Sequence, residues 1–296
     1  MQQTNTLFCF GLGYSALALA HRLKAQGWAV GGTCRSAESQ AALAAEGYAV
    51  TRSSREAVPV DPAGELATAT HLLVSVPPDE IGDPVIALYG DAIRARHAEG
   101  NPFVWVGYLS TTGVYGDRGG GWVDETDALA PTGERGQRRV DAERAWLDLL
   151  EQNGVPVHLF RLAGIYGPGR SALDTIRSGT ARRVVKAGQV FSRTHVEDIA
   201  SILEASIARP NPGAAYNVCD DDPAPPDEVL AFAAELLGLT PPPAVAFEQA
   251  VLSPMARSFY ADNKRVLNKR IKDELGVTLA YPSYKDGLRA LLAAGV

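Results

Sequence analysis

The sequence predicts an α/β fold with a doubly wound parallel sheet and a smaller C-terminal region. Short apolar runs alternate with longer amphipathic segments through the first half, a pattern typical of strand–helix–strand units. A glycine-rich turn joins the first apolar run to the first amphipathic segment. The length of 296 residues fits one large α/β domain with a modest addition.

The alternating elements are regular as far as the long loop in the middle of the chain. We expect strands at 7–10, 28–34, 48–51, 71–76 and 103–107, and helices at 15–26, 37–46 and 84–98. Pro77 and Pro78 end the fourth strand because proline lacks the amide that a sheet ladder needs. A polar, glycine-rich loop over 110–133 follows, then a helix at 135–152 and a strand at 155–162.

Beyond Gly164 the elements become short, with frequent proline and glycine. We expect helices at 195–208, 227–237, 263–275 and 284–294, and a strand at 215–218. The helix at 263–275 is interpreted as amphipathic, with a solvated basic face. We therefore place an N-terminal domain at 1–163 and a smaller C-terminal region at 164–296, part of which can return to the first domain.

Composition narrows the classes of function. A net charge of −6 argues against nucleic acid or an anionic membrane as the main partner. The residues before Leu7 carry no positive charge, and no apolar run approaches the ~20 residues of a membrane span, so we expect a cytoplasmic protein. The three cysteines are widely spaced, which favours buried thiols over a metal site or a disulfide.

The glycine-rich turn predicts a dinucleotide site in a Rossmann-type domain. The first strand leads into Gly11-Leu12-Gly13-Tyr14-Ser15-Ala16, a G-x-G-x-x-A turn that opens a helix. Gly11 permits the tight turn, Gly13 lets a pyrophosphate approach the backbone, and Ala16 allows close helix–strand packing. The amides of Tyr14, Ser15 and Ala16 begin the helix, whose positive dipole end favours phosphate.

The end of the second strand favours NADP over NAD. NAD sites usually place an acidic residue there to bind the ribose 2′-hydroxyl. This chain has Arg35 and Ser36 instead, and its next acid is Glu38. Arg35 can make charge-assisted hydrogen bonds to a 2′-phosphate, and the Ser36 hydroxyl can add another.

Further motifs resemble one known superfamily. They are Leu109-Ser110-Thr111-Thr112-Gly113-Val114-Tyr115-Gly116, Val123-Asp124-Glu125-Thr126, Arg161-Leu162-Ala163-Gly164-Ile165-Tyr166-Gly167-Pro168-Gly169, Thr194-His195-Val196-Glu197-Asp198-Ile199 and Tyr216-Asn217-Val218. In this order they resemble the extended short-chain dehydrogenase/reductase superfamily, and most closely its atypical, YeeZ-like subgroup of NAD-dependent epimerase/dehydratase-like proteins. The resemblance runs nearly end to end and implies a substrate bound by the C-terminal region.

The resemblance also assigns site residues by position. Thr111 stands at the family's catalytic Ser/Thr, whose hydroxyl can bond a substrate oxygen. Val76 and Pro77 stand where the fourth strand ends against the cofactor. The segment expected to approach the nicotinamide contains Leu162, Ala163 and Ile165.

The family's catalytic Tyr-x-x-x-Lys pair is absent. Alignment puts Arg135 in place of the tyrosine and Arg139 in place of the lysine. A guanidinium stays protonated, so neither arginine can relay a proton at neutral pH. Arg139 can still hydrogen-bond the nicotinamide ribose, and Arg135 can bind an anionic substrate. Phe191 replaces the arginine that sugar-nucleotide members carry near His195, which puts that substrate class in doubt.

Other groups have a functional and a structural interpretation. Tyr115 could supply the missing proton, but Tyr115 and Asp91 are interpreted more readily as a packing residue and a solvated helix charge. His195 is interpreted as structural, with Asp198 acting at a helix start. The scattered basic residues Arg170, Arg182, Arg183, Lys186 and Arg193 either converge on an anion or lie dispersed.

Three hypotheses follow. The first is an NADP-dependent oxidoreductase or epimerase-like enzyme that acts on a small hydroxy or carbonyl compound, anionic compounds included. The second is a non-catalytic module that binds or senses NADP(H). The third, a non-redox lyase or isomerase, stays open because fold does not fix function. The sequence leaves substrate, proton donor and oligomeric state open.

Overall fold

The computed structural model describes residues 5–57, 61–100 and 102–296, which form two compact units interleaved along the chain. Unit 1 comprises Met1–Thr111, Gln137–Arg161 and Ile199–Ala215, and unit 2 comprises Thr112–Gly136, Leu162–Asp198 and Tyr216–Val296. The chain thus enters unit 2, returns twice to unit 1 and ends in unit 2. The expectation drawn from the uncharged residues before Leu7 rests in part on residues 1–4, which lie outside the described residues.

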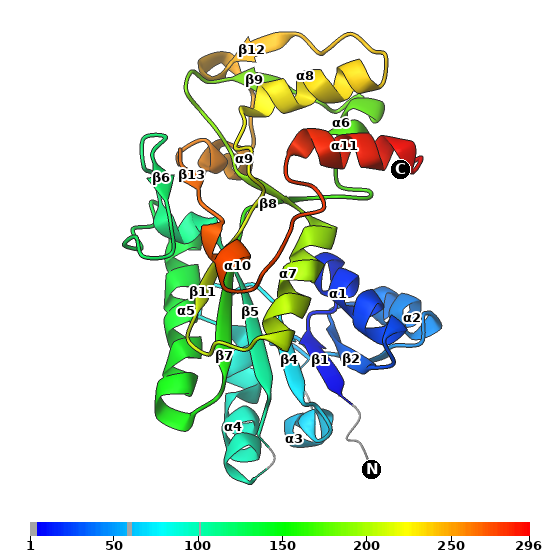
Figure 1. The fold of residues 1–296 in the computed structure, drawn as a ribbon, viewed down its shortest axis with the longest axis vertical. Helices are drawn as coiled ribbons and strands as arrows, with labels where there is room; N and C mark the ends of the chain where they lie inside the picture. The colour runs from blue at the N-terminus through cyan, green and yellow to red at the C-terminus, as the bar shows by residue number, and fades with distance from the viewer. Residues whose placement is uncertain (1–4, 58–60, 101) are drawn as a thin grey trace. The chain divides into compact units, whose positions relative to one another are not determined.

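A seven-stranded sheet organises the fold, which confirms the predicted α/β class (Figure 1). Its order is β11-β7-β5-β4-β1-β2-β3, and the pairings of β1 with β2 and β4, of β2 with β3 and of β4 with β5 are parallel. The strands are β1 Thr6–Phe10, β2 Ala29–Cys34, β3 Ala49–Arg52, β4 His71–Val74, β5 Trp105–Thr111, β7 Val157–Leu162 and β11 Ala215–Val218. The order reverses direction between β1 and β4, and ligands of such sheets bind at that switch point.

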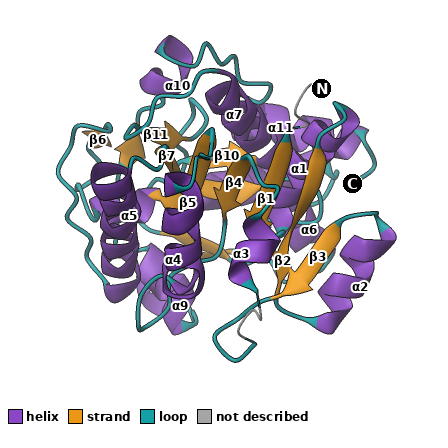
Figure 2. Cartoon of the chain, turned by 90° about the horizontal axis from the view of Figure 1, so that it is seen from below, coloured by secondary structure: helices purple, strands orange, loops and turns teal. Residues whose placement is uncertain are grey.

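Helices cover both faces of the sheet (Figure 2). They are α1 Tyr14–Ala25, α2 Ala37–Ala45, α3 Pro62–Leu66, α4 Pro84–Ala98, α5 Glu134–Asn153 and α7 Val196–Ala208. Successive strand residues point to opposite faces. Val106 accordingly joins the core formed with α4 and α5, whereas the Trp105 indole donates to Ser206 Oγ of α7 at 3.0 Å. Arg22 of α1 pairs with Glu204 of α7 at 2.9 Å.

Unit 2 has its own core of short elements. Its elements are η1 Thr112–Tyr115, β6 Trp122–Val123, β8 Gly164–Tyr166, α6 Ala172–Arg177, β9 Arg183–Val185, β10 Arg193–His195, α8 Pro226–Leu236, β12 Ala244–Ala246, η2 Phe247–Gln249, α9 Pro254–Phe259, β13 Arg265–Val266, α10 Lys269–Asp273 and α11 Tyr284–Ala293. Strand pairs β8–β10, β9–β12 and β6–β13 are parallel. Helices α6, α8 and α11 pack together around Leu173, Ala233 and Leu288.

Two expectations about local structure were wrong. The predicted helix at 263–275 is β13 followed by the short helix α10. Arg265 and Val266 pair with Trp122 and Val123 of β6, so cross-strand hydrogen bonds replace the helical ones. The fourth strand ends at Val74 instead of residue 76. Sequence analysis also missed α3, although Asp61 caps it and Pro62 occupies its first turn, both known start signals.

The described residues were compared with the requirements of a membrane span, a metal site and a disulfide. None of the helices among them combines the length and apolar character needed to cross a membrane. No group of His, Cys, Asp and Glu in the described ranges is placed to hold a metal ion. Cys9, Cys34 and Cys219 are buried free thiols.

Candidate functional site

The predicted phosphate turn lies at the carboxyl end of β1 in unit 1. Gly11 has φ of +79°, a left-handed conformation that favours glycine. Its amide donates to Thr33 Oγ1 at 3.0 Å, and the Leu12 amide donates to the Thr33 carbonyl at 2.8 Å. Thr33 is nearly fully buried at the end of β2. The turn is therefore fixed by the neighbouring strand, before any ligand binds.

The start of α1 is open. Gly13 is its N-cap and is exposed, and a Cβ built there would meet nothing within 4 Å. No side chain caps this helix, and its first turn carries no acidic residue. The first amides of a helix lack carbonyl partners within it and carry a partial positive charge. Tyr14, Ser15 and Ala16 form this turn, as predicted, so the geometry fits a diphosphate.

The end of β4 closes one side of the turn. Ser75 Oγ donates to the Gly11 carbonyl, and a Cβ on Gly11 would lie 2.9 Å from Val76 Cγ2. Val76 is half-buried and Pro77 is exposed. The structure thus brings Val76, predicted from the family resemblance, into contact with the glycine turn, directly at the switch point.

Basic residues lie at the ends of β2 and β3, where Arg35 follows β2 and Arg52 is the last residue of β3. Arg35 comes directly after Cys34, which is aligned with Arg52 in the parallel ladder. Both arginines are exposed, and parallel strands lie ~4.8 Å apart. Burial raises the pKa of Cys34, and the nearby charge of Arg52 opposes that shift. Ser36 is the N-cap of α2, with its hydroxyl accepting from the Ser39 amide and donating to Ser39 Oγ at 2.9 Å.

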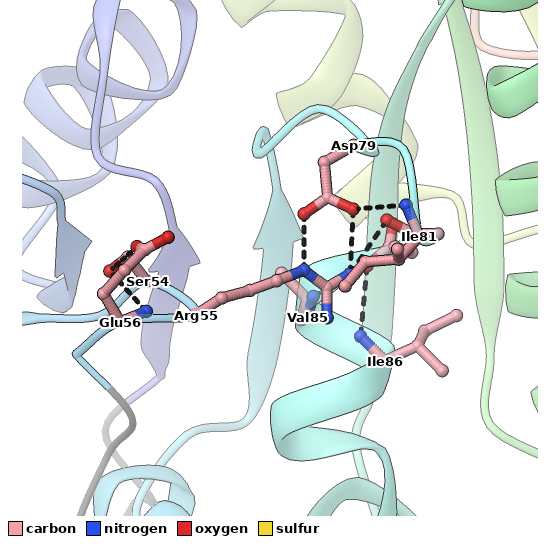
Figure 3. Close-up of polar contacts among 9 residues, drawn as sticks. Ser54, Arg55, Glu56, Asp79, Ile81, Val85 and Ile86 are labelled. Carbon is pink, nitrogen blue, oxygen red and sulfur yellow. Dashed lines mark hydrogen bonds and ion pairs between the residues drawn. The ribbon is translucent and has the colours of Figure 1, made fainter.

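A bidentate ion pair ties the loop after β3 to the loop after β4 (Figure 3). Arg55 donates from Nε to Asp79 Oδ2 at 2.5 Å and from Nη2 to Asp79 Oδ1 at 3.0 Å. The Ile81 amide also donates to Asp79 Oδ1, at 3.0 Å. These donors, the Arg55 side chain foremost, lower the pKa of Asp79 below its ordinary value. The pair fixes the loop that begins at Val76.

Thr111 ends β5, and Arg139 binds the same strand two and three residues earlier. Thr111 is the last residue of the strand and is half-buried. Arg139, from α5, donates through Nη1 to the Leu109 carbonyl at 2.7 Å and to the Tyr108 hydroxyl at 3.3 Å. Arg139 is therefore fastened to the strand that ends at Thr111, and its correspondence to the family's lysine stays a prediction.

A buried cluster supports this strand end from behind. Arg161 of β7 binds the Glu143 carboxylate of α5, with Nη2 2.9 Å from Oε2. Ser110 Oγ donates to Glu143 Oε1 at 2.5 Å. Glu143 follows Arg139 by one helical turn, so the same helix face carries both.

The other predicted site residues belong to unit 2. Tyr115 is fully buried, and its hydroxyl donates to Asn217 Oδ1 at 2.8 Å. Arg135 is exposed, with its guanidinium 5.6 Å from the centre of the Phe259 ring. Of the residues assigned to the nicotinamide side, Leu162 and Ala163 are buried and Ile165 is half-buried in β8. Their place in a cofactor site stays a prediction.

His195 and Asp198 hold parts of unit 2 together. The His195 ring accepts a hydrogen bond from the Glu197 amide at 3.2 Å, and burial lowers its pKa to about 4. Asp198 lies in the first turn of α7, and its carboxylate accepts from the amides of Ala280 and Tyr281 at 2.7 and 3.1 Å.

The scattered basic residues only partly converge. Arg182 and Lys186 donate to the carbonyls of Val251 and Tyr260. Arg170 and Arg193, by contrast, line one pocket.

Sequence analysis missed two residues that shape the unit 1 site. Thr33 holds the glycine turn, and Arg52 ends β3, the strand next to the one that Arg35 follows. Arg52 could have been found from its place at the end of the third predicted strand. Thr33 gives no sequence signal, because its contacts depend on how β1 and β2 align.

Known proteins resemble this chain in sequence and in structure. No protein-family model matches the chain. YeeZ from Escherichia coli K12 is 29% identical over 279 residues, which are 92% of this chain and 94% of YeeZ. The structure of a functionally unknown conserved protein from Silicibacter pomeroyi is 55% identical with a TM-score of 0.90, covering 98% of this chain and 99% of that one.

Two structures of named enzyme classes are also similar. One from Methylobacillus flagellatus, assigned as an NAD-dependent epimerase/dehydratase, is 27% identical with a TM-score of 0.73 over 99% of both chains. The dTDP-glucose 4,6-dehydratase of Bacillus anthracis, solved in complex with NAD, is 18% identical with a TM-score of 0.75, covering 98% of this chain and 96% of the other. The latter likeness shows the fold alone.

Proposed function

Since the chain belongs to the extended short-chain dehydrogenase/reductase superfamily, in the NAD-dependent epimerase/dehydratase-like group with YeeZ, we propose that it is an oxidoreductase or epimerase-like enzyme with a nicotinamide cofactor. Its substrate would be a small hydroxy or carbonyl compound. One observation carries this proposal. Helix α1 starts at the switch point of the sheet, no side chain caps it at Gly13, and its first turn contains no acidic residue.

Within this proposal the cofactor is NADP. Arg35 follows β2 and Arg52 ends the neighbouring strand β3, and we infer that both guanidinium groups reach a 2′-phosphate bound there. No acidic residue occupies the end of β2, where it would repel that phosphate. The dehydratase of Bacillus anthracis holds NAD, so the choice of NADP rests on these two arginines alone.

The chain's own residues would act on the substrate oxygen. A bound nicotinamide would supply or accept the hydride. Thr111 would hydrogen-bond the reacting oxygen, and Arg139 would hold the cofactor ribose while keeping its positive charge. Because Tyr115 is buried and donates to Asn217, we assign it a structural role. The proton would then come from water or from the substrate itself.

Titration of the purified chain tests the cofactor. Calorimetry with NADP and with NAD should show binding of both, with NADP tighter by roughly tenfold or more because of the added charge-assisted bonds. Equal affinities would overturn the choice of NADP. No heat with either would overturn the function as a whole.

A second candidate, a protein that senses NADP(H) without turnover, is favoured by one observation. Arg135 and Arg139 occupy the positions of the family's proton-relaying pair, and neither can release a proton near neutral pH. A screen of NADPH oxidation against aldehydes, ketones and keto-sugars separates the two candidates. Tight cofactor binding with no turnover across the screen would favour the sensor.

A further inference from the structure

Unit 2 contains a pocket of about 470 Å³, a volume typical of small-molecule sites. It lies among α6, α8, α11 and the ends of β8 and β10. Four of its lining residues offer apolar surface, namely Tyr166, Val229, Tyr284 and Leu288, all nearly buried. Three charged residues also line it, namely Arg193, Arg170 and Asp174, and of the two arginines Arg193 is half-buried whereas Arg170 is exposed. The pocket therefore pairs an apolar body with a charged wall in which Arg193 is the less exposed cation.

One edge of the Arg193 guanidinium faces no protein partner. Nη1 donates to the carbonyls of Phe191 and Ala224 at 2.8 and 3.0 Å, which fixes the side chain. The ring of Tyr284, with its centre 5.9 Å from Cζ, packs beside it. Among the described residues, Nε and Nη2 have no hydrogen-bond or ion-pair partner. The guanidinium edge of a half-buried arginine in a pocket wall, with no protein acceptor, is a site for a ligand acceptor.

The same edge binds carboxylates elsewhere in this chain. Arg55 uses Nε and Nη2 to hold both oxygens of Asp79, and Arg161 uses Nε and Nη2 to hold Glu143. This fork matches a planar carboxylate in a bidentate manner. Arg193 offers the fork, already oriented, to whatever enters the pocket.

Charges around the pocket favour a monoanion over a phosphate dianion. Asp220 approaches Arg193 without forming an ion pair, and both its carboxylate oxygens are buried without a hydrogen-bond partner. Burial raises its pKa to about 8, so near neutral pH it is largely protonated and leaves the charge of Arg193 uncompensated. Two further carboxyl groups, Asp174 in the pocket wall and Asp222 nearby, disfavour a second negative charge on the ligand.

We propose that this pocket binds a small organic carboxylate with an apolar, ring-sized body, held through the Nε–Nη2 edge of Arg193. The carboxylate would lie on the guanidinium and the body against Tyr166, Tyr284 and Leu288. Binding of such a ligand goes beyond the proposed cofactor function and does not depend on it.

Ligand-observed NMR and calorimetry on the full-length protein without cofactor test the proposal. The probes are phenylacetate, its neutral isostere phenylacetamide, and inorganic phosphate. Phenylacetate should bind, and the other two should bind at least roughly tenfold more weakly, because one lacks the charge and the other the apolar body. Equal binding of the amide, tighter binding of phosphate, or no binding of phenylacetate would overturn the proposal.

Substitutions of Arg193 test whether the ligand binds to its side chain. Arg193→Met should weaken phenylacetate by roughly tenfold or more, and Arg193→Lys should recover only part of the affinity because lysine lacks the planar fork. Arg289→Met, on the exposed side of α11, is the matched control and should bind as the wild type does. If Arg193→Met does not fold, Thr180→Trp, an exposed change at the pocket wall, should block phenylacetate instead. Unchanged affinity in the folded variants would overturn the assignment.

Discussion

Arg161 donates to both carboxylate oxygens of Glu143, from Nη2 to Oε2 at 2.9 Å and from Nε to Oε1 at 3.2 Å, and neither side chain is more than 6% exposed. Ser110 adds a third donor to the same carboxylate. The cluster joins β5, α5 and β7 immediately beside Thr111 and one helical turn from Arg139. It therefore holds the end of β5 against α5 and β7.

Replacement of Glu143 by glutamine should destabilise the protein strongly. Loss of one partner leaves the Arg161 charge buried, which costs roughly 3–5 kcal/mol in comparable pairs. Thermal unfolding checks this, with Asp148→Asn as control because Asp148 pairs with Arg144 at the surface. The control should lose less than about 1 kcal/mol. If both variants lose the same free energy of unfolding, the buried pair stabilises the protein no more than the surface pair does.

Glycines 11 and 13 should respond differently to alanine. Gly13→Ala should leave the melting temperature unchanged, since φ of −106° suits alanine and the space is open, but weaken cofactor binding roughly tenfold. Gly11→Ala should also destabilise the protein, by roughly 1–2 kcal/mol, because φ is +79° there. Calorimetry and thermal melting measure both. A Gly13→Ala protein with wild-type cofactor affinity would remove the turn from the site.

Arg35 and Arg52 should discriminate between the two cofactors. Arg35→Ala and Arg52→Ala should each weaken NADP by roughly tenfold, and leave NAD unchanged, because only NADP carries the 2′-phosphate. Arg22→Ala, on α1 and paired with Glu204, is a suitable control. If NAD weakens as much as NADP, the arginines act on the shared part of the cofactor or on the fold.

Thr111→Ala should lower kcat on the order of 100-fold for any substrate that the screen identifies, as loss of an oriented hydrogen-bond donor does in other enzymes. Cofactor affinity should not change, because Thr111 is proposed to contact the substrate oxygen. Thr112→Ala, the next residue, is the matched control and should retain activity. Wild-type kcat in Thr111→Ala would remove Thr111 from the reacting centre.

Asp220 should make stability depend on pH. Burial raises its pKa from 3.8 to about 8, so between these values the folded state binds more protons than the unfolded state. Stability contributed by this group is therefore lost as pH rises from about 4 to 8. Asp220→Asn mimics the protonated acid. The difference in melting temperature between this variant and the wild type should therefore increase, in favour of the variant, by roughly several degrees from pH 5 to pH 8.

The neighbouring Asp221 provides the control for that measurement. Asp221 forms a surface ion pair with Lys272, so Asp221→Asn should show no gain that grows with pH. A constant difference between Asp220→Asn and the wild type across this range would contradict the assigned titration.

Local pattern predicted most of unit 1 correctly. Alternating apolar runs gave the strands of the sheet, and the spacing of Gly11, Gly13 and Ala16 gave the turn that opens α1. These features depend on residues close in sequence, where hydrophobic period and backbone freedom act directly. Residues 263–275 show the limit, because their helical spacing of apolar residues was outweighed by the pairing of β13 with β6, a segment more than a hundred residues earlier.

By itself, therefore, the sequence determined the α/β class and the glycine turn that opens α1, and it predicted arginines at residues 135 and 139 in place of a proton-relaying pair. Only the tertiary structure decided that Arg52 pairs with Cys34, the residue before Arg35, that Tyr115 is buried against Asn217, and that Arg193 lines a pocket with one edge unpaired. The physical reason is that contacts between distant segments depend on strand register and on how helices pack. Those relationships are set by the folded chain as a whole.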